Sequence, residues 1–330
     1  MKICVYGAGG IGCYVGGRLA ASGSDVTFVG RPRLAAEVAS NGLRLTDFRG
    51  AELRVNAVRF EVVPEAAAEA DLVLVTVKSA GTATAGAELA KVLKPDAVVV
   101  SFQNGLRNAS VLRAALPGHR VVTGMVPFNV LNRGDGVFHQ GTEGFLDVEP
   151  GLSSYAPAFE AAGLPLTEHA DMAPVQWAKL LLNLNNPINA LSDLPLRDEL
   201  SQRGYRLCLA AAQSEALVVL KAAGIEPAQL TAVPARLMPR ILRLPDWLFR
   251  RLAGRMLAID PLARSSMWED LQAGRPTEID YLNGEITTLG ASLGIPTPIN
   301  TRITTLIHQS EQTPTPYPAA TLLHHLTAPS

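Results

Sequence analysis

The sequence predicts an α/β protein in which a mostly parallel, doubly wound sheet is followed by an all-α C-terminal domain. Three observations lead to this expectation. The first half of the chain alternates short β-type runs with Ala-rich helical stretches, which is typical of βαβ units. A glycine-rich motif directly follows the first of these runs. From about residue 171 the β-type runs end and helical periodicity takes over.

The predicted strands of the first half are short and rich in valine. They cover residues 2–6, 25–29, 71–77, 97–102 and 120–126. Between residues 42 and 59, apolar and polar residues alternate around Phe48-Arg49-Gly50. This alternation predicts a hairpin with one exposed face, and we expect it at the side of the sheet.

The second half shows helical periodicity in residues 172–184, 207–224, 263–274 and 278–294. A chain of 330 residues is long for a single core, so two domains are expected. We place the first at residues 1–170 and the second at residues 171–330.

Composition and charge favour an ordinary soluble enzyme. Hydrophobic residues make up 48% of the chain, and the formal net charge of −1 creates no global field that would attract nucleic acid. We find no apolar run of about 18 residues and no signal-peptide core, so no membrane span is expected. The three cysteines, Cys4, Cys13 and Cys208, lack CxxC spacing and suit a reducing cytoplasm. No metal-ligand set is predicted.

The glycine motif is Gly7-Ala8-Gly9-Gly10-Ile11-Gly12, which fits GxGxxG. In a dinucleotide site the first glycine allows a tight turn, the second lets the backbone approach a pyrophosphate, and the third lets helix and strand pack closely. By itself the motif could be a plain glycine-rich turn. Here a strand-like run precedes it and a helix-prone stretch follows it, so the sequence predicts a Rossmann-type N-terminal domain.

The acid that usually binds the adenosine ribose of NAD is absent from residues 27–36. Asp25 lies at the wrong end of the second predicted strand. Arg31 and Arg33 lie just past the other end, where a guanidinium can pair with a 2′-phosphate. This pattern predicts NADPH/NADP as the cofactor; the alternative is that both arginines are solvated loop residues.

Lys78 and Asn104 each follow a predicted strand. Groups beyond the carboxyl ends of parallel strands face the ligand crevice, so we expect both to meet ribose, nicotinamide or substrate. The alternative interpretation makes Lys78 a solvated loop charge and Asn104-Gly105 a turn selected for its backbone conformation.

Two later stretches carry a resemblance to a known family. With "WAKLLLNLNNPINAL" (177–191) and "SSMWEDLQAGRPTEIDYLNGEI" (265–286), the sequence resembles the ketopantoate reductase (2-dehydropantoate 2-reductase) family over nearly its whole length. The positions that match the family pattern are Gly7, Gly9, Gly12, Lys78, Asn104-Gly105, Lys179, Asn183, Ser265-Ser266-Met267, Asp270, Gly274 and Thr277 to Gly284.

The resemblance implies an oxidoreductase that reduces the keto group of a small-molecule 2-oxo acid. Hydride would come from C4 of the nicotinamide and a proton from a lysine, converting ketopantoate to pantoate on the route to coenzyme A. Lys179 and Asn183 are four residues apart, so on a helix they share one face. An ammonium there can stabilise the forming alkoxide and donate the proton, which makes Lys179 the expected general acid. The alternative is a lysine that extends to solvent from an amphipathic helix.

The resemblance also assigns roles to Glu278 and Ser266. Glu278 would hydrogen-bond the substrate and help to hold Lys179, while Asn183, Ser266 and Asn104 would bind substrate. Local sequence alone predicts only a helix start here, with Thr277 as N-cap and Asp280 closing a capping box.

The chain departs from the family pattern in two places. Asn186 lies three residues after Asn183, where the family commonly has an asparagine four residues on, so a second amide contact is uncertain by spacing. About thirty extra residues fall in the segment 230–260, which mixes arginines with apolar residues. This segment could touch a membrane or partner. The alternative is a helical pair that covers the substrate cleft or forms a subunit contact, and a homodimer through the helical domain agrees with the resemblance.

The sequence is compatible with two other functions. One is reduction of a different, bulkier 2-oxo acid on the same scaffold, because pocket side chains rather than the fold set the substrate. The other is a non-catalytic NADP(H)-binding sensor that signals through the added segment.

Overall fold

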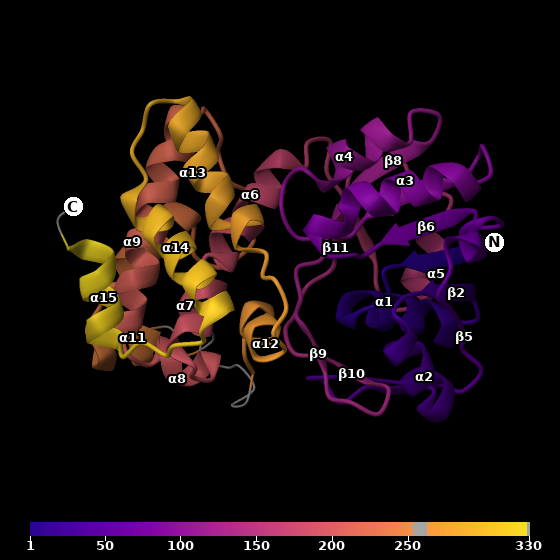
Figure 1. Cartoon of the computed structure of the whole chain (residues 1–330), viewed down its shortest axis with the longest axis horizontal. Coiled ribbons are helices and arrows are strands. Elements are labelled where there is room, and N and C mark those ends of the chain that lie inside the picture. The colour runs from indigo at the N-terminus through magenta and orange to yellow at the C-terminus, as the bar shows by residue number, and fades with distance from the viewer. Residues whose placement is uncertain (253, 255–262, 329–330) are drawn as a thin grey trace. The chain divides into compact units, whose positions relative to one another are not determined.

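The structure is a computed structural model that describes residues 1–252, 254 and 263–328. It divides into two compact units, Met1–Met172 and Ala173–Ser330. Figure 1 shows strands interleaved with helices in the first unit, whereas the described residues of the second are helical. The predicted fold class is therefore confirmed.

The main sheet of the first unit has eight strands in the order β12-β11-β8-β7-β6-β1-β2-β5. All pairs from β8 to β5 are parallel, whereas β11 is antiparallel to β8. The bounds of these strands are β1 (Lys2–Tyr6), β2 (Asp25–Val29), β5 (Arg59–Glu61), β6 (Leu72–Val75), β7 (Val98–Ser101), β8 (Arg120–Met125), β11 (Leu146–Val148) and β12 (Leu166–Glu168). The first two strands begin and end where the sequence predicts.

Both faces of this sheet are covered by helices. Val5 and Leu74 belong to one apolar cluster, and their neighbours Cys4 and Val73 belong to the other. Because successive side chains of a strand point to opposite faces, strands buried on both sides read as continuous apolar runs. The covering helices are α1 (Gly10–Ala21), α2 (Pro32–Asn41), α3 (Thr82–Val92), α4 (Asn108–Ala115) and α5 (Ala156–Ala161).

The predicted hairpin forms, but it does not lie at the side of the main sheet. β3 (Leu43–Asp47) and β4 (Glu52–Val55) pair antiparallel in a second sheet of order β4-β3-β10-β9, with β9 (Val130–Asn132) and β10 (Val137–Gln140). Leu45 of this hairpin packs on α1, where a Cβ at Gly17 would lie 2.9 Å from its Cδ1. Because the buried leucines of the hairpin pack against α1, the hairpin lies in the second sheet. Strand β5 forms the edge of the main sheet instead.

The second unit is built around the long helix α9 (Arg203–Ala222). The other helices are α6 (Ala173–Asn183), α7 (Asn185–Ser192), α8 (Leu196–Leu200), α10 (Met238–Leu242), α11 (Asp246–Leu252), α12 (Ser266–Gln272), α13 (Asn283–Ser292), α14 (Pro298–Gln312) and α15 (Ala319–Thr327). No helix in the described ranges is long and apolar enough to cross a membrane.

The first part of the extra segment forms the short helices α10 and α11, and α10 packs against α9. Leu242 and Phe249 are fully buried, and the buried guanidinium of Arg206 stacks on the Phe249 ring at 4.1 Å. The same guanidinium donates to the carbonyls of Leu200, Leu242 and Leu244. As far as residue 252, the segment thus contains two short helices, and a role in covering the substrate cleft or in a subunit contact stays a prediction. Residues 253 and 255–262 lie outside the described residues.

Candidate active site

The first functional feature is the sharp turn after β1. Gly7 has φ +93°, and a Cβ there would lie 2.3 Å from Cγ1 of Val77. The backbone N–H groups of Gly7 and Ala8 both donate to the carbonyl of Val29, at 2.9 and 2.8 Å. Because only glycine adopts this conformation in so little space, position 7 fixes the direction of the chain as it enters α1.

Gly9 and Gly12 serve different purposes at the start of α1. A Cβ at Gly12 would lie 2.5 Å from Oγ1 of Thr76 and 2.8 Å from Cγ1 of Val5, so this glycine permits close helix–strand packing. A Cβ at Gly9 would meet only the carbonyl of Gly7, at 3.9 Å. Gly9 is the N-cap, and the first-turn N–H groups of Gly10, Ile11 and Gly12 follow it. The space over Gly9 and these donors fit a pyrophosphate.

The other predicted cofactor residues follow strands next to β1. Strands β2, β1, β6 and β7 are consecutive and parallel in the sheet. Arg31 follows β2, the glycine turn follows β1, Lys78 follows β6 and Asn104 follows β7. These residues therefore share the carboxyl edge of the sheet. The strand order changes direction at β1, and ligands of open α/β sheets bind at such a point.

The cofactor-specificity region follows β2. Arg31 is exposed at the N-cap of α2, where its carbonyl accepts the N–H groups of Leu34 and Ala35, and its guanidinium makes no hydrogen bond or ion pair within the described part of the chain. Arg33, by contrast, lies 3.6 Å from the Glu37 carboxylate, one helical turn further on. Of the two arginines, Arg31 thus keeps its guanidinium available.

The absence of an acid at one of these positions, Gly30, has a structural explanation. A Cβ at Gly30 would lie 2.9 Å from the Phe60 ring and 3.0 Å from the carbonyl of Ala8, so position 30 has no room for a side chain. An acid does stand on the neighbouring strand: Glu61 pairs with Val29, and its carbonyl accepts the Gly30 N–H at 3.0 Å. Scanning one segment of sequence could not find it, because the two strands meet only in the folded sheet.

A buried polar network joins the loops that carry Lys78 and Asn104. Ser79 Oγ donates to the carbonyl of Asn104 at 2.9 Å, and Asn108 Nδ2 donates to the same carbonyl at 2.5 Å. Gln103 Nε2 reaches the other loop, at the carbonyl of Val77, at 3.0 Å. Ser79, Gln103 and Asn108 were not predicted from the sequence, although polar side chains in and just after an apolar strand are an available signal. They hold the two loops at a fixed spacing.

In the second unit, Lys179 and Asn183 lie on α6 as predicted, one turn apart on the same face. Asn183 is 8% exposed and Lys179 is half-buried. Burial lowers the pKa of the Lys179 ammonium from its usual 10.5 to about 8. At neutral pH the side chain therefore holds a proton that it can release more readily than an exposed lysine.

Ser266 is the exposed first residue of α12. The N-cap before it, Ser265, accepts the Trp268 N–H on its Oγ at 3.1 Å and donates from that Oγ to the carbonyl of Asn186 at 3.0 Å. The start of α12 is thereby tied to the start of α7. Asn185 Nδ2 instead donates to Glu199 in the core at 3.0 Å, which leaves the half-buried Asn186 as the candidate for a second amide contact.

Glu278 is 8% exposed and precedes a short 3₁₀ turn, Ile279–Tyr281. The capping box predicted here is wrong, because Thr277 and Asp280 have other partners. The backbone N–H and Oγ1 of Thr277 donate to Glu311 at 2.8 and 2.7 Å, while Asp280 lies 3.1 Å from His308. The α-helix starts later, at Asn283, and tertiary contacts to α14 hold the turn that carries Glu278.

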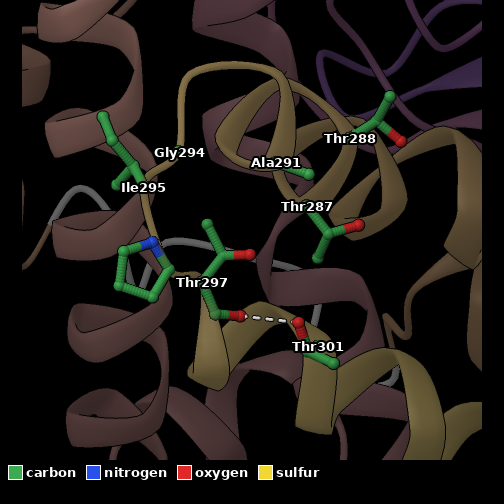
Figure 2. A pocket seen from close by; sticks show the side chains of 8 residues that line it. Thr287, Thr288, Ala291, Gly294, Ile295, Thr297 and Thr301 are labelled. Atoms are coloured by element: carbon green, nitrogen blue, oxygen red, sulfur yellow. Dashed lines mark hydrogen bonds between the residues drawn. The ribbon is translucent and has the colours of Figure 1, made fainter.

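The helical unit also has an open hollow of about 640 Å³ at the α13–α14 turn. Figure 2 shows threonine hydroxyls around it, including Thr301, which donates to the carbonyl of Thr297 at 2.7 Å. The side chains that line it are neutral and cannot supply a proton near pH 7. The groups suited to acid–base chemistry lie instead on α6 and the Glu278 turn.

A Rossmann-type domain whose glycine turn has room for a pyrophosphate, together with a helical domain that carries a half-buried lysine, is the arrangement expected of a dinucleotide-dependent oxidoreductase. The family description "Ketopantoate reductase PanE/ApbA" matches residues 3–151, and its C-terminal counterpart matches residues 171–311. The chain belongs to the ketopantoate reductase family, and the resemblance seen in the sequence is confirmed. By this membership it is an oxidoreductase that uses a nicotinamide cofactor.

Relatives match along almost the whole chain. The 2-dehydropantoate 2-reductases of Halobacterium salinarum and Archaeoglobus fulgidus are 27% and 28% identical, and each alignment covers 94% of this chain and 99% or 98% of the relative. A crystal structure of a PanE/ApbA family ketopantoate reductase from Ralstonia eutropha is 32% identical, with a TM-score of 0.80, and covers 95% and 99% of the two chains. D-mandelate dehydrogenase with NADH and anilino(oxo)acetate has a TM-score of 0.77 at 20% identity over 95% and 99%, which bears on the fold alone.

Proposed function

We propose that this protein reduces the keto group of a 2-oxo acid with NADPH, and that its substrate is ketopantoate, which becomes pantoate. The observation that carries this proposal is Lys179, a half-buried ammonium with a pKa lowered to about 8 on the helix of a ketopantoate reductase family member. The curated relatives from Halobacterium and Archaeoglobus support the choice of substrate by name.

In this reaction the chain's own residues manage charge and protons. The bound nicotinamide supplies a hydride to the carbonyl carbon of the substrate. As that carbon is reduced, its oxygen becomes negative, and the Lys179 ammonium stabilises the charge and donates the proton that completes the alcohol. A lysine pKa near the working pH favours this transfer, because the group is largely protonated yet a better acid than a free lysine.

The remaining site residues orient the two reactants. We assign Asn183 and Ser266 to hydrogen bonds with the substrate, Glu278 to the substrate and to Lys179, and Asn104 to the substrate and cofactor at the sheet edge. Lys78 and the turn Gly7-Ala8-Gly9-Gly10-Ile11-Gly12 bind the cofactor. Fixed hydrogen-bond donors around a reacting carbonyl reduce the entropy cost of reaching the transition state.

The preference for NADPH rests on Arg31, for which the described structure records no ion pair. Arg31→Ala should weaken NADPH binding by about tenfold or more and leave NADH binding nearly unchanged, because only NADPH carries the 2′-phosphate. Titration of both cofactors by fluorescence measures this. Arg33→Ala is the matched control, since Arg33 is already paired with Glu37. Equal weakening of both cofactors in Arg31→Ala would refute the phosphate contact.

The substrate is tested by following NADPH absorbance with ketopantoate and with a panel of branched and aromatic 2-oxo acids. We expect the highest kcat/KM with ketopantoate. An absence of ketopantoate turnover combined with turnover of a larger acid would replace the specific assignment but keep the reaction.

A bulkier 2-oxo acid stays the alternative substrate, because pocket side chains rather than the fold set substrate choice. The homodimer through the helical domain and the cytoplasmic location stay predictions of the sequence.

A further inference from the structure

One of the buried carboxyl groups of the helical unit, that of Glu199, has no direct use in the proposed reaction. Glu199 on α8 is 0% exposed. Its Oε2 accepts hydrogen bonds from Asn185 Nδ2 at 3.0 Å and Asn189 Nδ2 at 3.4 Å. In the described part of the chain, Glu199 Oε1 and Asn185 Oδ1 are both buried without a hydrogen-bond partner.

The groups that face Glu199 do not neutralise a negative charge. Helix α7 has no ionisable side chain, and α9 presents Tyr205 and Cys208, whose pKa values burial raises. The guanidinium of Arg206, also on α9, is directed to three backbone carbonyls and to Asp246. The ionisable neighbours of Glu199 on α8, Arg197 and Asp198, are exposed.

Because Glu199 is desolvated and receives only two amide hydrogen bonds, its pKa is raised from 4.5 to about 8. At neutral pH it is therefore a carboxylic acid rather than a carboxylate. Because Oε2 accepts both amide hydrogen bonds, the proton belongs on Oε1, which accepts no hydrogen bond among the described residues. An ionised Glu199 would place an uncompensated charge in the core.

A short chain of hydrogen bonds leads from Glu199 to the candidate substrate residues. Asn189 also donates to the carbonyl of Leu194 at 2.9 Å, and its Oδ1 accepts the Ser265 N–H at 2.8 Å. Ser265 in turn donates to the carbonyl of Asn186 at 3.0 Å. Ser266 follows directly, so the buried amide of Asn189 orients the junction between the start of α7, which carries Asn186, and the start of α12, which carries Ser266.

We propose that Glu199 is a positioning residue whose neutral carboxylic acid orients Asn189 and thereby fixes the α7–α12 junction that presents Asn186 and Ser266 to the substrate. The proposal rests on the proposed function, in which Ser266 binds the substrate. Its consequence is a loss of substrate affinity at alkaline pH that arises from Glu199 and is separate from the deprotonation of Lys179.

The first test measures KM and kcat by steady-state kinetics between pH 6.5 and 9.5. It compares the wild type with Glu199→Gln and Glu199→Ala. A glutamine keeps a neutral side chain with donor and acceptor, so Glu199→Gln should retain the neutral-pH KM within about twofold and lose its alkaline rise. Glu199→Ala should raise KM by about tenfold at every pH with little change in kcat. The exposed Glu226→Gln is the matched control and should keep the wild-type profile.

The alkaline fall in kcat that belongs to Lys179 should persist in Glu199→Gln, which separates the two groups. A rise in KM above pH 8 that survives in Glu199→Gln would overturn the proposal, as would a wild-type KM that does not change with pH. If Glu199→Ala does not fold, Glu199→Gln alone still decides between these outcomes.

A second readout does not depend on catalysis. Trp268 donates its backbone N–H to Ser265 Oγ, so its fluorescence reports on the start of α12. With Trp177→Phe and Trp247→Phe removing the other tryptophans, we expect a fluorescence transition near pH 8 that Glu199→Gln abolishes. A transition that persists in Glu199→Gln, or none in the parent protein, contradicts the positioning role. If the fluorescence behaves as expected but no 2-oxo acid is reduced, the proposed function fails and the role of Glu199 at the junction stands.

Discussion

Lys179→Ala should lower the turnover of a 2-oxo acid by about 10³-fold or more while NADPH still binds. The variant removes both the charge that stabilises the forming alkoxide and the proton donor, and each of these contributions alone is typically worth about 10²-fold or more. Steady-state kinetics and a fluorescence titration of NADPH measure the two effects. Lys221→Ala, an exposed lysine on α9, is the matched control and should retain wild-type turnover. A non-catalytic sensor would show no turnover to lose.

The pH dependence of the same group has a definite sign. Reduction needs the ammonium, so kcat should be nearly constant below pH 8 and fall about tenfold per pH unit above it. Because the folded pKa is lower than the unfolded one, the unfolded chain binds more protons between pH 8 and 10.5, and stability should rise with pH across that range. Lys179→Met should accordingly unfold at a higher urea concentration than the wild type at pH 7. Equal unfolding midpoints would indicate that the ammonium is solvated.

The parts of the fold that could be predicted are those set by local pattern. The strands Lys2–Tyr6 and Asp25–Val29 are apolar runs that end at glycine, and the structure has the same bounds. The hairpin around Phe48 was also predictable, but its partner strand β10 lies almost a hundred residues away and reads "VFHQ", too short a pattern to recognise. Its place in a second sheet depends on packing against α1 that no local pattern contains.

In the candidate site, too, features set by local sequence could be predicted, whereas features set by tertiary contacts could not. The residues at the sheet edge follow from strand order, so the glycine turn, Lys78 and Asn104 could be placed from sequence. The capping box at Thr277 was wrong because a distant carboxylate, Glu311, binds that threonine. Glu199 could not be predicted from the sequence, because its raised pKa depends on burial against α7 and α9. The only local signal is a pair of apolar neighbours, Leu196 and Leu200, on a short charged helix.

Gly9→Ala and Gly12→Ala should separate cofactor binding from folding at the start of α1. A methyl group at position 9 meets no protein atom closer than 3.9 Å, and its φ of −123° is open to alanine. Stability should therefore change by less than about 1 kcal/mol. The same methyl group would occupy the space where the pyrophosphate approaches the backbone, so NADPH affinity should fall by about 100-fold, or roughly 2.7 kcal/mol.

Gly12→Ala should behave differently because its methyl group would be forced against Thr76 and Val5 at 2.5 and 2.8 Å. Overpacking of this kind costs about 1–3 kcal/mol, so the variant should unfold at a lower urea concentration as well as bind NADPH weakly. Urea unfolding and cofactor titration of both variants give the comparison. If Gly9→Ala binds NADPH like the wild type, the pyrophosphate does not pass over this turn. The helix N-terminus would then be a structural feature rather than the cofactor cradle.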